Sequence, residues 1–309
     1  MEIIKYQSDY LFEWNDFNSK SKNGLFLFHR DYLEYHNDRF VDHSLMISKN
    51  NKIICLFPAN ETNKEIHSHG GLTFGSLIMS FDLKATEVLE IFDLIKKYYS
   101  ELGFEKIIYK AIPSIFHKYP SDEDLYALFR NDATLIRRDI SSVVALKDKI
   151  RFSETKRQSV TKCIKNEIII SENEDFKEYW TLLTDVLSKF DTKPVHSLEE
   201  IEHLKASFPK NIKLFEARKE EELLAGIVIY DYEKVVHTQY MANSQEGRKI
   251  GALDFINNSL ITEVFKDRNY YSFGISTESQ GKHLNSGLIQ QKEMMGGRGI
   301  ALDFYSITL

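Results

Sequence analysis

The sequence has few of the residues that mark disulfide-bonded, Pro-rich or membrane-spanning proteins. Its 309 residues include only five prolines and two cysteines. It therefore has neither a Pro-rich linker nor the cysteine pattern of a disulfide framework or a zinc site. No apolar run approaches the roughly 18 residues that span a bilayer. We expect Cys55 and Cys163 to be buried thiols.

The N-terminal stretch and the charge narrow the class of protein further. MEIIKYQSDY lacks the basic start and the apolar centre of a signal peptide, which makes the cytoplasm the expected compartment. The net charge of −6 argues against a protein whose whole surface binds nucleic acid, although a local basic groove stays compatible with it. The length of the chain predicts two domains of about 150 residues each.

The predicted order of secondary-structure elements occurs twice along the chain. Each half has a hairpin, a third strand, a helix, a strand, a second helix and a final strand. In the first half these elements are expected at 44–61, 65–71, 85–104, 105–113, 123–137 and 138–148. In the second half they are expected at 212–233, 234–244, 251–269, 270–277, 283–295 and 299–309. Two copies of one fold, at 1–150 and 151–309, explain this order economically.

Local signals position the turns and caps. Lys49-Asn50-Asn51-Lys52 is expected to turn the first hairpin, and Gly103 to end the helix that starts near residue 85. Ser153 is placed to cap a helix at the start of the second half. Ser197 and Glu200 have capping-box spacing before another helix.

The order of elements resembles that of the GNAT acyltransferase fold. Its tandem use is similar to the Fem-type peptidyltransferases and to the GNAT-type proteins of bacterial surface-polysaccharide loci. The resemblance is carried by ELLAGIVIYDYEKVVHTQYMANS, GRKIGALDFINNSLI, YYSFGISTESQGKHLNSGLIQQKEMMGG, ALDFYSI and, near the N-terminus, FLFHRDYLEYHNDRFVDHSL. It implies an α+β fold of two tandem GNAT-like domains, each a mixed, mostly antiparallel sheet flanked by helices. The coiled-coil arm of Fem-type enzymes has no counterpart here.

The resemblance also implies a function. It predicts a cytoplasmic N-acyltransferase that moves an acyl group from acyl-CoA, such as acetyl-CoA, to an amine, without a metal. The amine would belong to a nucleotide-activated sugar or another polysaccharide precursor. The second domain would bind the donor and catalyse, and the first would be degenerate, with an acceptor-binding or structural role. Two alternatives stay open: a Fem-type transferase that uses aminoacyl-tRNA, the one case with a nucleic-acid partner, and a non-catalytic scaffold.

Lys292 is the first candidate catalytic residue. In Fem-type relatives the final helix carries a Phe-Lys pair, with the lysine near the transferred acyl carbonyl. Here Gln291 replaces the aromatic residue, while Lys292 is kept. An ammonium at that place would stabilise the oxyanion of acyl transfer, whereas a solvated lysine at a helix end is the simpler alternative. Gly296, Gly297 and Gly299 are expected to permit the reversal into the last strand.

The resemblance also points to a coenzyme A site. GNAT enzymes bind pyrophosphate through backbone N–H groups of an Arg/Gln-x-x-Gly-x-Gly/Ala turn that opens a helix. RKIGAL offers Arg248, Lys249, Gly251 and Ala252, with Leu253 departing from the pattern at its last position. An ordinary loop glycine at a helix start is the alternative. The first half has no glycine at the equivalent helix entry.

Further candidates come from residue chemistry and their place in the predicted fold. His237 lies in the third strand of the second repeat and is a candidate base, because its pKa is normally near neutral. A structural histidine with satisfied hydrogen bonds is the alternative. Glu278 is a competing base, and Tyr240 a candidate acid or acceptor contact. Candidate acceptor-binding residues are Arg157, His196, Asn285, His29, Tyr32, His36 and Arg39, although polar residues there can equally hold loops. His67 and His69 lack the third and fourth ligands that a metal site needs.

Overall fold

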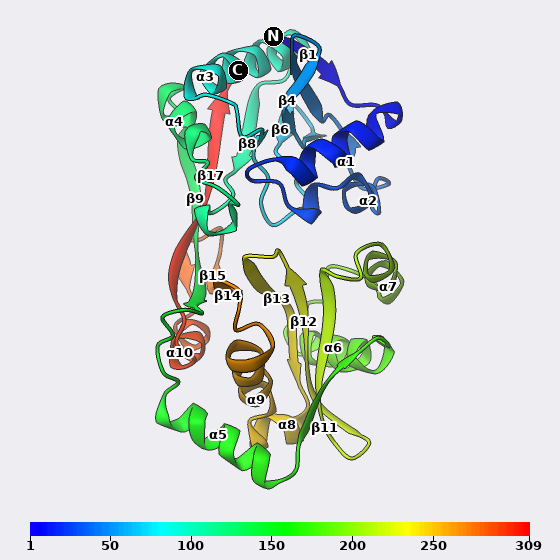
Figure 1. Cartoon of the computed structure of the whole chain (residues 1–309), viewed down its shortest axis with the longest axis vertical. Coiled ribbons are helices and arrows are strands. Elements are labelled where there is room, and N and C mark those ends of the chain that lie inside the picture. The colour runs from blue at the N-terminus through cyan, green and yellow to red at the C-terminus, as the bar shows by residue number, and fades with distance from the viewer. The chain divides into compact units, whose positions relative to one another are not determined.

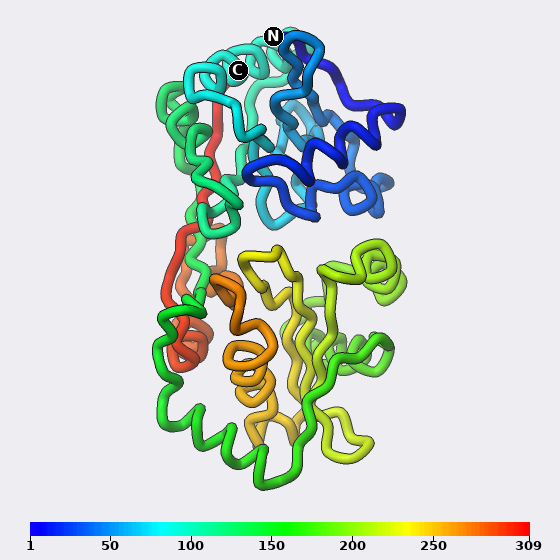
Figure 2. The backbone as a smooth tube through the Cα atoms, viewed as in Figure 1, coloured from blue at the N-terminus to red at the C-terminus, as the bar shows by residue number.

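The computed structural model describes all residues from 1 to 309, and the chain forms two units. Unit 1 comprises residues 1–139, 279–282 and 301–309, and unit 2 comprises residues 140–278 and 283–300. Strands β9 (Thr134–Ala145) and β17 (Arg298–Thr308) each contribute residues to both units. Both ends of the chain lie in unit 1 (Figure 2).

Unit 1 contains two sets of paired strands. One has the order β1-β3-β4-β7, and β17, β8, β6, β5 and β2 lie next to one another, in that order, in the other. The pairing of β6 with β8 is parallel, and the other pairings are antiparallel. The strands are β1 (Glu2–Lys5), β2 (Val41–Asp42), β3 (Leu45–Lys49), β4 (Lys52–Phe57), β5 (Asn60–Thr62), β6 (Glu65–His67), β7 (Ile78–Met79) and β8 (Lys106–Lys110).

Helix α3 (Ala85–Glu101) supplies one side of the unit 1 core. Val88, Ile91 and Ile95 recur at helical spacing and are buried with side chains of β3, β4 and β8. The helix ends just before Gly103, whose φ of +85° is the left-handed conformation that glycine adopts without strain. The other helices are α1 (Leu11–Lys20), α2 (Arg30–Leu33), α4 (Glu123–Arg130) and the short 3₁₀ turns Ser8–Tyr10, Phe26–Phe28 and Ser114–Phe116.

A sheet with the strand order β10-β11-β12-β13-β14-β9 forms the centre of unit 2. Only β13 and β14 pair in parallel. β15 and β16 form a separate two-stranded hairpin. The strands are β10 (Ile169–Asn173), β11 (Ile212–Lys219), β12 (Glu222–Asp231), β13 (Val235–Asn243), β14 (Tyr270–Ile275), β15 (Thr277–Glu278) and β16 (His283–Leu284).

Helices cover both faces of the unit 2 sheet, with α9 and α6 on opposite sides of β11–β13 (Figure 1). On the α9 face, Ile256 packs in one apolar cluster with Ile227 and Ile229. On the α6 face, the ring of Trp180 contacts Tyr240 edge-on, with centroids 5.3 Å apart. The helices are α5 (Glu154–Lys165), α6 (Lys177–Ser188), α7 (Leu198–Ser207), α8 (Gln245–Ile250), α9 (Ala252–Ser259), the π-helix Leu260–Val264 and α10 (Ser286–Met294).

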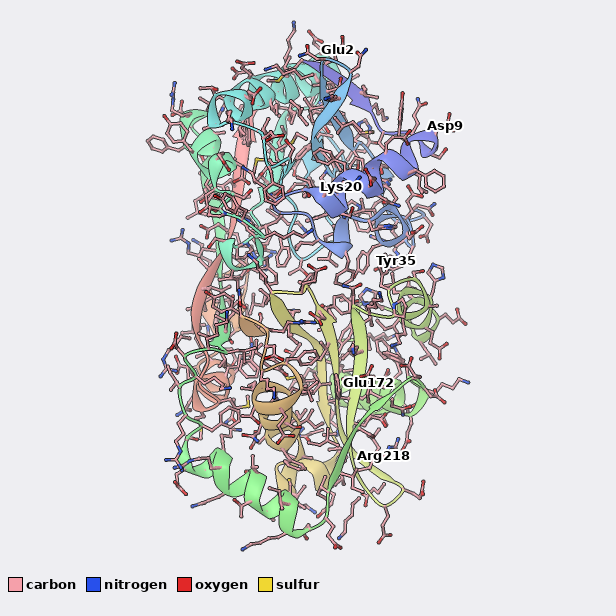
Figure 3. The ribbon with its side chains drawn as sticks, in the orientation of Figure 1. Glu2, Asp9, Lys20, Tyr35, Glu172 and Arg218 are labelled. Atoms are coloured by element: carbon pink, nitrogen blue, oxygen red, sulfur yellow. The ribbon has the colours of Figure 1, made fainter.

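One buried acid on the α6 face shows how unit 2 tolerates charge in its interior. Glu216 on β11 is only 1% exposed. It accepts hydrogen bonds from Asn173 Nδ2 and from Nε of Arg218, which is labelled in Figure 3, both at 2.9 Å. Because Arg218 supplies the opposite charge, the buried carboxylate is paired rather than isolated.

The predicted fold class is confirmed, and one predicted helix is too long. The turn at Asn50 and Asn51 has the positive φ values of 52° and 60° that the sequence predicts. Helix α4, expected over 123–137, ends at Arg130, because Asp132 adopts φ +51° and the following residues enter β9. None of the helices combines the length and apolarity that crossing a bilayer requires.

Candidate active site

In unit 2, the parallel strands β13 and β14 pair over a short stretch and then part. Pairing runs from Val235 opposite Tyr270 to His237 opposite Ser272. Beyond His237, β13 stays paired with β12 as far as Asn243, whereas β14 continues beside β9. The strands therefore separate at their carboxyl ends, which is where ligands bind in sheets with parallel strands.

A β-bulge on β13 determines which side chains point toward this place. His237 and Tyr240 are three positions apart, so a regular strand would put them on opposite faces. Their partners on β12, Tyr230 and Val228, are two positions apart, and Gln239 is the extra residue of the bulge. The bulge thus brings His237 and Tyr240 to the same face of the sheet.

His237 is held against β14. Its Nδ1 lies 3.0 Å from Ser272 Oγ. The backbone of Gly274, with φ +73°, approaches so closely that a Cβ there would lie 3.3 Å from the His237 ring. Burial, and to a smaller extent the charge of Lys292, lowers the pKa of His237 to about 4. The imidazole is therefore neutral at pH 7 and can accept a hydrogen bond.

Lys292, in the last turn of α10, lies beside this histidine. Its side chain is buried, with 3% exposure. Nζ donates to the carbonyl oxygens of Gly274 at 2.9 Å and Ile275 at 2.6 Å. Burial lowers the pKa of Lys292 to about 8, so the ammonium still prevails at pH 7. Because an ammonium has three N–H donors, one donor is left for a ligand. We call His237, Ser272, Gly274 and Lys292 the strand-divergence site.

The start of α10 is fixed by the side chain of Asn285. Its Oδ1 accepts a hydrogen bond from Leu288 N at 2.9 Å, which caps the helix. Its Nδ2 donates to Glu278 Oε1 at 2.7 Å. Glu278 is exposed. The structure thus pairs two sequence-predicted site residues, Asn285 and Glu278, in an arrangement that holds the helix.

The three glycines after α10, Gly296, Gly297 and Gly299, have different structural roles. Gly296 alone has a positive φ, +84°. A Cβ at Gly297 would lie 2.8 Å from Lys292 O, and one at Gly299 would lie 2.7 Å from the Ile140 side chain. Gly297 N donates to Lys292 O at 3.0 Å, so Gly297 also belongs to the reversal. The expectation that all three glycines serve the reversal is therefore wrong for Gly299, which allows close packing instead.

Helix α5 is hydrogen-bonded to the C-terminal half of α10, which carries Lys292. Lys156 Nζ donates to Asp254 Oδ1 on α9 and to Gln291 Oε1 on α10, both at 2.7 Å. At the N-terminus of α5, Ser153 N donates to Met294 O at 2.8 Å. Three helices are thus joined through the nearly buried ammonium of Lys156.

Arg157, the neighbouring candidate for acceptor binding, is engaged within its own helix. Its guanidinium pairs with the carboxylate of Glu154. Its Nε is buried and has no hydrogen-bond partner. Lys162 and Lys165 on the same helix are exposed, and Lys162 Nζ donates to Lys249 O at 2.9 Å.

Tyr240 and His196 form a second contact on the α6 face. Tyr240 Oη lies 2.6 Å from His196 Nδ1. Burial raises the pKa of Tyr240 to about 12, so its hydroxyl stays protonated at neutral pH and can donate a hydrogen bond. The structure thus brings together two residues that the sequence singled out separately.

The candidate coenzyme A turn lies between α8 and α9. Gly251 adopts φ +87°, and a Cβ there would lie 2.5 Å from Ser159 Cβ on α5. Ala252 is fully buried. The glycine is therefore required by the packing of α5. Arg248 and Lys249 are exposed, and theirs are the side chains that this turn offers to a phosphate group.

The four acceptor candidates near the N-terminus lie in unit 1. His29 pairs with Asp31 at 2.9 Å. Tyr32 and His36 are buried, with the His36 ring 5.5 Å from that of His69. Arg39 is exposed. No group of three or more His, Cys, Asp or Glu side chains could hold a metal ion.

Several residues of the site were missed by reasoning from sequence. Ser272 and Gly274 are identified by the register of β14 and by the contact of Gly274 with His237. The sequence also does not indicate that Lys156 joins α5 to α9 and α10. The one signal for Gly274 in the sequence is its place inside a predicted strand. A glycine inside a strand often marks the close approach of another segment or a ligand.

Comparison with known proteins places this geometry on a known fold. No protein-family model and no curated protein matches the sequence. Among solved structures, FemX superposes with a TM-score of 0.70 at 10% identity, over 100% of this chain and 98% of FemX. L-PGS from Bacillus licheniformis gives 0.66 at 14% identity, over 98% and 92% of the two chains. A tandem GNAT protein from the clavulanic acid biosynthesis pathway gives 0.57 at 6%, over 99% and 98%.

At these identities the likeness concerns the fold. It extends over nearly the whole length of each chain, and it agrees with the repeated order of elements in the sequence. The protein therefore has the tandem GNAT fold that these structures share, as its sequence predicts.

Proposed function

We propose that the protein is an N-acyltransferase that transfers an acyl group from a thioester or ester donor to an amine at the strand-divergence site. The buried ammonium of Lys292 carries this proposal. Two carbonyls hold it where β13 and β14 part, beside the neutral ring of His237. A cation fixed in advance at such a place stabilises the oxyanion that forms when an amine attacks a carbonyl carbon. The fold shared with FemX and with a tandem GNAT protein supports acyl transfer.

The expected mechanism is direct transfer. The free amine attacks the carbonyl carbon of the donor, and Lys292 donates a hydrogen bond to the resulting oxyanion. The tetrahedral intermediate then collapses, the bond from carbon to sulfur or oxygen breaks, and the proton that the amine loses as the amide forms ends on the departing sulfur or oxygen. His237 accepts a hydrogen bond from the attacking amine. Its pKa of about 4 makes it a weak base, so the amine must arrive uncharged. Tyr240 is the expected donor to the leaving group.

Acyl-CoA is the proposed donor. Arg248 and Lys249 would contact its phosphates, since both are exposed beside the turn that leads into α9. The proposed acceptor is an amine on a nucleotide-activated sugar, a choice that rests on the resemblance to proteins of polysaccharide loci.

Calorimetric titration with coenzyme A and acetyl-CoA tests the donor. The variant Arg248→Ala, Lys249→Ala should weaken saturable binding by about tenfold or more, because two charged contacts are lost. Lys165→Ala, an exposed lysine on α5, is the matched control and should bind normally. Gly251 is left unchanged, because a side chain there would collide with Ser159. Absence of binding at millimolar ligand would exclude coenzyme A.

Aminoacyl-tRNA is the second candidate donor. The packing of α5 against Gly251 favours it, because this contact occupies one side of the turn that would cradle a pyrophosphate. Binding of aminoacyl-tRNA would fall steeply with salt, since phosphate contacts release counterions. A protein that binds neither donor and shows no turnover would be a scaffold.

A further inference from the structure

Unit 1 contains a cavity that the proposed reaction does not use. Its volume is about 260 Å³. That exceeds the roughly 150 Å³ of a cavity that holds benzene and falls just below the range of about 300–1,000 Å³ for drug-sized ligands. The size suits a ligand of one ring. Its polar lining includes Tyr6, Arg30, Glu34, Asn37, Asp42 and His69.

The charges around this cavity favour a cation over an anion. Arg30 is 2% exposed and supplies the one positive side chain. Its Nε donates to Glu34 Oε1 at 2.8 Å, and one terminal nitrogen pairs with Asp42. Two carboxylates thus face one guanidinium, which leaves an excess of one negative charge. Both carboxylates would repel an anionic ligand, whereas an ammonium group would neutralise the excess negative charge.

His69 supplies a second, independent indication of a ligand. Its side chain lines the cavity, is 3% exposed, and its Nδ1 has no hydrogen-bond partner. A buried polar atom without a partner is unfavourable unless a ligand or water satisfies it. His69 also adopts φ +58°, a conformation rare outside glycine that is often held at binding sites. Burial, His36, Lys110 and Arg30 hold the pKa of His69 well below its usual value, so its neutral ring can accept a hydrogen bond.

We propose that this cavity binds a small, ring-sized molecule with a primary ammonium group, of the class of amino sugars. Glu34 and Asp42 would balance the charge, and the neutral ring of His69, which lines the cavity, would accept a hydrogen bond from the ligand. The remaining lining, with carboxylate, amide and hydroxyl groups, suits neighbouring hydroxyls. The site lies wholly in unit 1 and does not depend on the acyl-transfer reaction.

The test compares glucosamine with glucose, which differ at one position of the same ring. Each is titrated into the full-length protein at a pH where the amine of glucosamine is protonated, and binding is measured by calorimetry and by the NMR signals of the histidine rings. Glucosamine should bind and shift the signals of His69, and glucose should bind at least about tenfold more weakly, since it lacks the charge. Equal binding of the two sugars, or no binding of glucosamine, would overturn the proposal.

Variants locate the binding. Asn37 is exposed at the cavity, so Asn37→Trp should block the cavity without disturbing the ion pairs of Arg30 and should abolish binding. Glu34→Gln should weaken it by about tenfold. Glu13→Gln, an exposed acid on α1 outside the cavity, should change nothing. If Glu34→Gln unfolds because Arg30 loses a partner, Asn37→Trp still decides: unchanged affinity in that variant would place the ligand elsewhere and refute the site.

Discussion

The parallel strand pairs of the two units begin alike and end differently. In unit 1, β6 and β8 pair as far as His67 opposite Ile108, and in unit 2, β13 and β14 pair as far as His237 opposite Ser272. In both pairs a histidine occupies the last position. Near the end of each pair lies a buried lysine whose Nζ donates to two backbone carbonyls, Lys110 in unit 1 and Lys292 in unit 2.

The two units differ in the path of the chain beyond the histidine. In unit 1 the chain turns back over β8. There Ser68 Oγ accepts from Lys110 N at 2.8 Å, Gly75 N donates to Lys110 O at 2.8 Å, and Lys110 Nζ binds the carbonyls of Gly70 and Leu72. In unit 2, β13 continues straight on and the lysine comes from a separate helix. A buried lysine therefore does not by itself indicate a catalytic site. In unit 1 the buried Lys110 binds carbonyls of the loop that covers the strand end, which is a structural role.

The largest expected effect separates the two lysines. Lys292→Met should lower kcat/KM by about 100-fold or more, the usual effect of losing one oxyanion donor, with donor binding largely kept. Lys110→Met should leave kcat/KM within about twofold. It should destabilise the protein by roughly 1–3 kcal/mol, since the carbonyls of the loop lose their partner. Steady-state kinetics and chemical denaturation measure both. Equal losses of activity in the two variants would remove the distinction between the units.

The pH dependence sharpens this comparison. In the proposed reaction only protonated Lys292 carries the charge that stabilises the oxyanion, so kcat/KM calculated on the concentration of uncharged amine should fall as the pH rises through about 8, the pKa of this lysine. Lys292→Arg should keep part of the activity and lose that alkaline limb, because a guanidinium stays protonated throughout the range. An alkaline limb that persists in the arginine variant would assign it to another group.

The two histidines should differ by a smaller factor. His237→Gln replaces the fixed ring acceptor for the attacking amine with a flexible amide and should lower kcat/KM by about tenfold, in keeping with one hydrogen bond of roughly 1.4 kcal/mol. His67→Gln, at the matching position of unit 1, should have no effect on rates. His67 Nε2 is already engaged with Glu65 at 3.1 Å. A comparable loss from His67→Gln would show that both strand ends contribute to the reaction.

The smallest effect concerns the loop that closes the unit 1 strand pair. A Cβ at Gly75 would lie 1.9 Å from Ser68 O, so Gly75→Ala should lower the free energy of unfolding by about 1–3 kcal/mol through overpacking. Gly103→Ala is the matched control for backbone strain, because Gly103 has φ +85° and nothing within 4 Å of an added Cβ. It should cost about 1 kcal/mol. Thermal melting distinguishes them, and a smaller loss at Gly75 than at Gly103 would contradict the loop contact.

The sequence predicts the elements of the fold and part of the site. The helix that carries Lys292, the strand that carries His237 and the capping pair of Ser197 and Glu200 can be inferred from periodicity and cap chemistry, which are local. The grouping of His237 with Tyr240 cannot, because it depends on the bulge at Gln239, which appears only once the register with β12 is known.

Contacts between segments that are distant in the chain could not be predicted from the sequence either. Lys156 contacts Asp254 and Gln291, 98 and 135 positions further along the chain. The contact between Tyr240 and His196 spans 44 positions. Such contacts depend on how the helices dock on the sheet, and no spacing within a single element encodes them.

The path of the last strand has a consequence for how the protein is made. Residues 301–309 belong to unit 1, where β17 pairs with β8 from Phe304 opposite Lys110 to Thr308 opposite Lys106. During synthesis, the edge of β8 therefore stays exposed until residues 304–308 have left the ribosome. An exposed strand edge is a template for wrong pairing. Unit 1 can thus be completed only after residues 140–300, which include all of unit 2, have been translated, and deletion of residues 304–308 would damage unit 1.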